Sequence, residues 1–183
     1  MKILQFKTLH TFLFLLSIIF SFTLNAQGGG WNPERVKDSK KALNKMIEDT
    51  PKLQSFKNKA YGYVVFPRVT KVGIGIGGAA GRGIVFRNHQ DVGSSSLKQA
   101  SIGLQLGGEQ YSEVIFFENK KAYDHFINGK LKFNAQASAV AITAGASVDA
   151  AYNEGVAVFT RTKGGLMYQA SIGGQHFKFH AKE

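Results

Sequence analysis

The 183-residue chain contains no cysteine, only three prolines and about half as many acidic as basic residues. Without cysteine it can form no disulfide bridge, offer no thiol nucleophile and carry no lipid on a lipobox cysteine. The G-x-S-x-G motif, which surrounds the nucleophilic serine of α/β-hydrolases, is also missing. The longest apolar run covers 14 residues, Thr11 to Leu24, and falls short of the roughly 20 needed for a membrane-spanning helix. Several enzyme classes and a helical anchor are therefore disfavoured from the start.

The N-terminus has the pattern of a secretory signal peptide. Lys2 and Lys7 precede the apolar run, and Leu24-Asn25-Ala26 follows its end as a candidate cleavage site. We expect residues 1–26 to be removed and the mature chain to begin with a flexible linker at residues 27–31, followed by one domain at 32–183. The expected location is periplasmic or secreted, with no transmembrane span in the mature chain.

A strong positive charge remains after removal of the signal peptide. Residues 27–183 hold 21 Lys and Arg against 12 Asp and Glu, a formal charge of +9. Such an excess attracts anionic partners over long distances. Because export separates the protein from nucleic acid, phospholipid head groups or another anionic polymer of the envelope are the expected partners.

The first predicted element is an amphipathic helix over residues 32–49. Asn32 is a good N-cap and Pro33 suits the first helical position. At 100° per residue, the apolar residues fall on one side and a lysine stripe on the other. The apolar side comprises Val36, Leu43, Met46 and Ile47, and the stripe comprises Lys37, Lys41 and Lys45. Thr50-Pro51 predicts a second, short helical segment that reaches about Lys57.

Strand patterns follow from residue 60 onwards. Segments 61–67, 71–86, 99–110, 112–118, 132–153, 155–165 and 166–180 are rich in β-branched or aromatic residues, or alternate between large and small ones. A short helix is expected at 118–129, ended by Gly129. Because several strands carry one face of Gly, Ala and Ser, we predict an α+β, mainly antiparallel fold whose sheet curls tightly into a barrel-like form. The polar stretch 87–96 is interpreted as a loop.

Signals for catalysis or cofactor binding are weak. Gly73 to Gly78 satisfies G-x-G-x-x-G, but the motif lies among strands and no helix follows to hold a pyrophosphate. His176 and His180, four apart on a strand, are about 13 Å from each other and cannot share a metal ion. An enzyme would have to gather residues such as His89, Asp91, His125 and Asp149 into one cleft. We expect no catalytic residues, no metal site and no cofactor.

The order of the glycine-rich blocks resembles the SYLF domain family. The resemblance rests on "KAYGYVVFP.VTKVGIGIGGAAGRGIVF", "ASIGLQLGGEQYSEVIFF" and "VAVFTRTKGGLMYQASIGG", and runs from about Ser39 to Gly174. It implies a lipid-binding module without catalytic activity, which binds acidic phospholipids through an amphipathic N-terminal segment and basic residues. Some fungal members of the family also bind actin. Unlike the eukaryotic members, this chain is expected to have a signal peptide and no partner module.

Carried onto this sequence, the resemblance assigns lipid binding to the helix at 33–49 and to nearby basic residues. The candidate lipid-binding residues are Trp31, Lys37, Lys40, Lys41, Lys45, Lys52, Lys57 and Lys71. Trp31 is equally well interpreted as a cap over the core. The alternative function is that of an envelope structural or interaction protein, whose basic face binds a protein or an anionic polymer. A lysine face continuous with an exposed apolar patch would favour lipid.

Overall fold

In the computed structural model, the described residues are 30–74, 76–102, 107–131, 152–163, 165–169 and 174–183. They form three helices and seven strands. In chain order these are α2 (Pro33–Asp49), α3 (Leu53–Lys59), β1 (Gly62–Ile74), β2 (Ile76–Arg87), β3 (Gln90–Ile102), β4 (Gly107–Phe117), α4 (Lys120–Ile127), β5 (Val156–Thr162), β6 (Gly165–Gln169) and β7 (Gln175–Ala181). The predicted strand at 132–153 lies almost entirely outside the described residues.

One antiparallel sheet contains all seven strands, in the order β6-β5-β4-β1-β2-β3-β7. In the described part of the chain, β6 and β7 each pair on one side only and form the two edges. The fold is therefore α+β as predicted, but the predicted barrel-like closure is wrong. Small residues let neighbouring backbones approach one another, yet they do not by themselves join the edges of a sheet.

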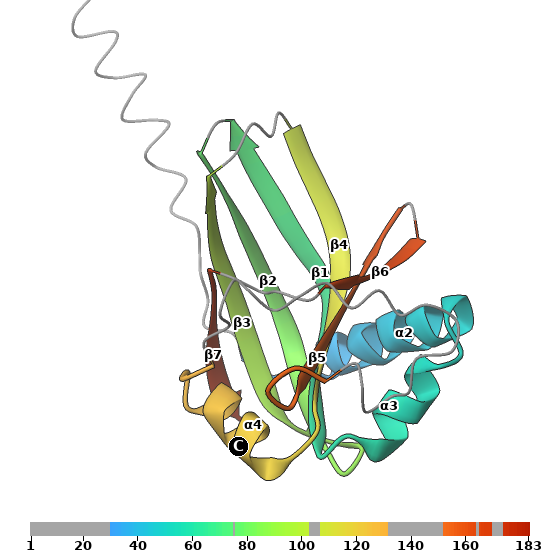
Figure 1. Cartoon of the computed structure of the whole chain (residues 1–183). Coiled ribbons are helices and arrows are strands. Elements are labelled where there is room, and N and C mark those ends of the chain that lie inside the picture. The colour runs from blue at the N-terminus through green and yellow to red at the C-terminus, as the bar shows by residue number, and fades with distance from the viewer. Residues whose placement is uncertain (1–29, 75, 103–106, 132–151, 164, 170–173) are drawn as a thin grey trace, which may run out of the picture.

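Helices cover both faces of the sheet (Figure 1). Alternate residues of each strand point to opposite faces, so Tyr63 and Val65 pack with α2 and α3, whereas Val64 and Phe66 belong to the core under α4. Figure 1 shows α2 and α3 together at the right and α4 at the lower left, with β1 to β4 extending upwards beyond them. The apolar core is thus divided into two layers by the sheet.

Local sequence signals explain where α2 begins and ends. The Asn32 side chain accepts a hydrogen bond from the Arg35 backbone N–H at 2.7 Å, and Pro33 occupies the first turn. The helix ends at Asp49, because the following Thr50 precedes a proline and is extended. Leu43 and Met46 are buried against the sheet, as the amphipathic pattern predicted.

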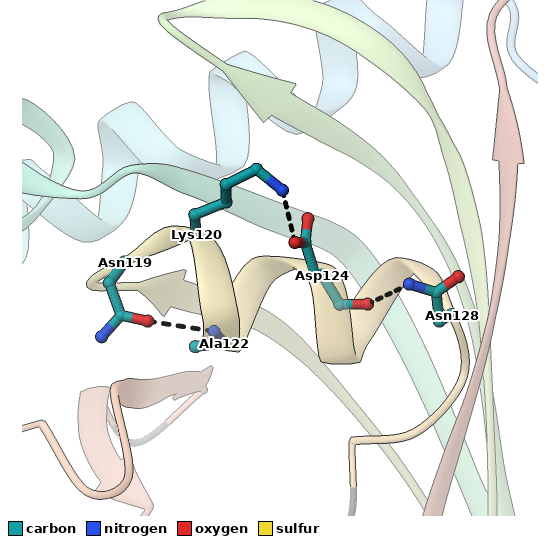
Figure 2. A network of polar contacts seen from close by, with 5 residues as sticks. All are labelled: Asn119, Lys120, Ala122, Asp124 and Asn128. Carbon is teal, nitrogen blue, oxygen red and sulfur yellow. Dashed lines mark hydrogen bonds and ion pairs between the residues drawn. The ribbon is translucent and has the colours of Figure 1, made fainter.

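The same kind of signal defines α4 (Figure 2). Asn119 caps the helix by accepting a hydrogen bond from the Ala122 N–H at 3.0 Å, and Lys120 pairs with Asp124 one turn later. Asn128 donates to the Asp124 carbonyl at the other end, and Gly129 follows with a φ of +66°. This agrees with the predicted stop at Gly129.

The strand pattern of 71–86 is divided between β1 and β2, with Ile74 opposite Ile76. One local prediction fails at the start of β3. The predicted polar loop is a tight turn at Asn88 and His89 followed directly by β3. Ser94 and Ser95 are fully buried there because β3 lies between β2 and β7, although nothing in its polar sequence indicates a buried strand.

Candidate functional site

The outer face of α2 carries four exposed lysines. Lys37, Lys40, Lys41 and Lys45 line one shallow groove together with Val36 and Asn44. Glu48 lies at its end, but within the described residues none of the four lysines forms an ion pair with a carboxylate. We call these four residues the α2 lysine face. Its cations are available to an external anion.

The apolar side of the same helix is occupied by the protein core. Met46 has no exposed surface and Leu43 is buried, while Val36 and Ile47 are partly buried against the same cluster. The helix is also fastened at its C-terminal end, where Asp49 accepts a hydrogen bond from Arg161 of β5. Insertion of this apolar side into a bilayer would require α2 to leave the sheet.

The other lysines predicted to bind lipid lie outside the α2 lysine face. Lys52 precedes α3 and is half-buried, and Lys57 lines a separate groove between α2 and α3 with Lys40 and His89. Lys71 follows Val69 by two residues on β1 and opposes Ala79, so it lies on the face of the sheet opposite α2. The structure therefore brings Lys37, Lys40, Lys41 and Lys45 together and separates Lys71 from them.

Trp31 is held within the folded domain. Its indole N–H donates to Asp91 of β3 at 2.7 Å, and Lys182 donates to the same carboxylate oxygen at 2.7 Å. The Lys182 ammonium also lies 4.2 Å from the centre of the Trp31 ring. Hydrogen bonding to Lys182 is the main reason why the pKa of Asp91 lies below its ordinary value, and the bond from Trp31 adds to it. We call these three residues the Trp31 clasp, and it joins the start of α2 to β3 and the C-terminal segment.

A basic cleft between α2 and the sheet was not found from the sequence. It encloses about 550 Å³, and its cationic side chains are Arg35, Lys41, Lys45, Arg68 and Arg82. Glu34 and Asp38 also line it. Lys41 and Lys45 belong to both this cleft and the α2 lysine face. The only sequence signal was the "FPR" stretch at Phe66 to Arg68, where a proline inside a strand pattern indicates a bulge.

The described residues that an enzyme would have to gather do not lie in one cleft. His89 lies in the β2–β3 turn beside α2 and α3, whereas His125 is exposed on α4, which covers the other face. Asp91 is engaged by Trp31 and Lys182, and Asp149 lies outside the described residues. In the part of the chain that the structure describes, no three His, Cys, Asp or Glu residues are grouped for metal binding. Nor does any described helix have the length and apolar character to cross a membrane.

These features define an α+β domain with an open antiparallel sheet and a cationic surface built around α2. The family model for Ysc84, described as Las17-binding protein actin regulator, matches residues 98–183. Beta cell expansion factor A of Aeromonas veronii is 28% identical over 156 residues, which are 80% of this chain and 59% of that protein. The chain thus spans less than two thirds of that relative's length.

These matches confirm the resemblance seen in the glycine-rich blocks, and residues 98–183 are similar to the Ysc84/SYLF family. The family is associated with lipid and actin binding and is generally a non-catalytic binding domain. The residues matched by the family model begin within β3, so α2 and its lysines precede them.

Proposed function

We propose that the protein is an exported, non-enzymatic Ysc84/SYLF protein that binds anionic phospholipid at a membrane surface through the α2 lysine face. The observation that carries this proposal is the exposure of Lys37, Lys40, Lys41 and Lys45 in one groove, without carboxylate ion pairs among the described residues. The family association with lipid supports the same partner class.

The expected attachment is electrostatic. Each lysine near an anionic leaflet contributes about 1 kcal/mol, and the attraction decays within a Debye length. Since Leu43 and Met46 are buried in the core, α2 keeps its apolar side on the sheet while its lysines contact head groups. Binding should therefore weaken steeply as salt is raised.

A specific observation favours a second candidate, an envelope interaction protein that binds an anionic polymer or protein. Among the described residues, Val72 is the one large apolar side chain that is strongly exposed, at 57%, and it lies on β1 rather than on α2. The lysine face is therefore not continuous with a large apolar patch in this part of the chain. A polymer needs no such patch, whereas lipid binding would rely on charge alone.

Co-sedimentation of the purified protein with liposomes tests the proposal. The protein should bind phosphatidylglycerol-containing vesicles at low salt, bind neutral vesicles weakly and dissociate at high salt. The double variant Lys37→Glu/Lys40→Glu should lose most of this binding. The control Lys121→Glu/Lys130→Glu changes the net charge by the same amount, but at α4 and just after it. This control should retain vesicle binding. Equal loss in both variants would reject the α2 lysine face, and no binding by the folded wild-type protein would reject lipid in favour of the polymer.

A further inference from the structure

The cleft beside α2 is built where β1 is irregular. The register of β1 against β2 shifts between Val65 and Arg68, and the Ser112 hydroxyl donates to the Pro67 carbonyl at 2.8 Å within this bulge. After the bulge, Arg68 stands directly opposite Arg82 of β2. Both arginines line the cleft, and α2 forms its other wall.

Placing like charges opposite each other on neighbouring strands is unfavourable. A third arginine, Arg35 of α2, is close enough for Arg82 to act on it, since burial first and then the charge of Arg82 lower the pKa of Arg35. Glu34 and Asp38 line the same cleft, yet no ion pair joins a carboxylate to Arg35, Arg68 or Arg82 in the described ranges. Within this part of the protein, no carboxylate lies at ion-pair distance from any of the three arginines.

The chemistry of these side chains selects the ligand. A guanidinium presents a planar fork of donors that matches two oxygens of one phosphate group. Arg35 uses one of its donors on the Gly30 carbonyl, which fixes the side chain and leaves the rest of its fork available. Lys41 and Lys45 add two ammonium groups at the rim that is shared with the α2 lysine face.

We propose that the cleft formed by Arg35, Arg68 and Arg82 binds a terminal phosphate group, a phosphate monoester or pyrophosphate that carries two or more negative charges, in preference to a phosphodiester. A terminal phosphate offers three oxygens to the converging arginines, whereas a diester offers two and a single charge. The phosphate can belong to a lipid head group or to a free anion. The lipid source rests on the function proposed above, and the free anion does not.

Calorimetric titration with sodium pyrophosphate tests the cleft without a membrane. The wild-type protein should bind, and Arg68→Gln/Arg82→Gln should weaken binding about tenfold or more, because several charge-assisted hydrogen bonds are lost. Arg68→Lys/Arg82→Lys keeps the charge but not the fork and should be intermediate. The control Lys121→Gln/Lys130→Gln removes two charges elsewhere and should bind like wild type. Circular dichroism establishes that each variant is folded.

A vesicle experiment distinguishes the two sources of phosphate. Phosphatidic acid carries a monoester and phosphatidylglycerol a diester, so a preference for phosphatidic acid that disappears in Arg68→Gln/Arg82→Gln identifies a lipid head group. Pyrophosphate binding without that preference identifies a free anion. If the folded wild-type protein shows neither, or if the cleft variant and the lysine control lose binding equally, the proposal is overturned. In that case the protein could still bind phosphatidylglycerol through Lys37 and Lys40. The experiments therefore test the arginine cleft and the α2 lysine face separately.

Discussion

The Gln175 side chain donates a hydrogen bond to Glu113 at 3.2 Å, although β1, β2 and β3 lie between their strands in the sheet. Neighbouring strands are about 4.8 Å apart, so in a flat sheet β4 and β7 would be too far from each other for this contact. The two side chains meet because the sheet is concave on the face that carries α4. Glu113 is completely buried there, and one of its oxygens has no partner among the described residues. The sheet remains open while its concave face encloses a carboxyl group.

Burial of Glu113 predicts a pH-dependent stability. Burial raises the pKa of Glu113 from 4.5 to about 7, and the hydrogen bond from Gln175 opposes this only in part. The folded state therefore holds a proton that the unfolded state has released between about pH 4.5 and about pH 7. Stability should fall across this window by about 3 kcal/mol and level off above it.

Glu113→Gln should remove this dependence, because the amide has no proton to lose. The variant should exceed wild type in free energy of unfolding at pH 8 and match it more closely at pH 4.5, measured by urea titration. Glu109→Gln changes an exposed carboxylate on the same strand and should leave the wild-type slope unchanged. An unchanged slope in Glu113→Gln would contradict the assignment.

The Trp31 clasp should stabilise the fold. Trp31→Phe removes the indole donor to Asp91 and should lower the free energy of unfolding by about 1–2 kcal/mol. Because the pKa of Asp91 is depressed in the folded state, its contribution is present above the ordinary value of 3.8 and is lost on further acidification. Unfolding followed by circular dichroism should therefore show a smaller difference between variant and wild type at pH 2 than at pH 6.

The clasp also predicts how Trp31 behaves on a membrane. Trp31 is the one tryptophan of the chain, so its fluorescence reports on this position alone. With the clasp intact, binding to phosphatidylglycerol vesicles should leave its emission maximum unchanged. Asn44→Trp in a Trp31→Phe background places the reporter on the outer side of α2 and should respond to vesicles. A blue shift of Trp31 in the wild-type protein would show instead that the clasp opens and the indole enters the interface.

Gly83 has a structural role beside the β1 bulge. A Cβ atom at this position would lie 2.4 Å from the Val65 carbonyl oxygen and 2.8 Å from the Phe66 ring. Gly83→Ala should therefore destabilise the protein by about 1–3 kcal/mol through steric strain. Gly108→Ala is a matched control on β4, since its Cβ would make only ordinary contacts at 3.7 Å. Equal thermal stability of the two variants would contradict the close approach at Gly83.

The helices were predictable because their signals are local. Asn32-Pro33 and Thr50-Pro51 mark the two ends of α2, and Gly129 marks the end of α4. The apolar runs of β4 and β5 were recognised for the same reason. Strand β3 was not recognised at its start, because Ser94 and Ser95 owe their burial to neighbouring strands and not to their own sequence.

Only the part of the candidate site that lies on α2 could be predicted from the sequence. Helical periodicity placed Lys37, Lys41 and Lys45 on one face, and the structure has all three exposed there. The cleft arginines come from a helix and two strands, and only the bulge and the crossing of α2 bring them together. Lys71 could be assigned to a face only after the register beyond the bulge was known.

Both ends of α2 are fastened to the sheet, by Asp91 at its start and by Arg161 at its end. The lysines between these ends consequently have a fixed spacing. Lys37 and Lys45 are eight residues apart, which corresponds to about 12 Å along the helix axis. A flexible basic tail adapts to any arrangement of negative charge, whereas this helix presents a rigid template. The domain should therefore respond to how densely anionic groups are spaced on a surface, and not only to how many there are.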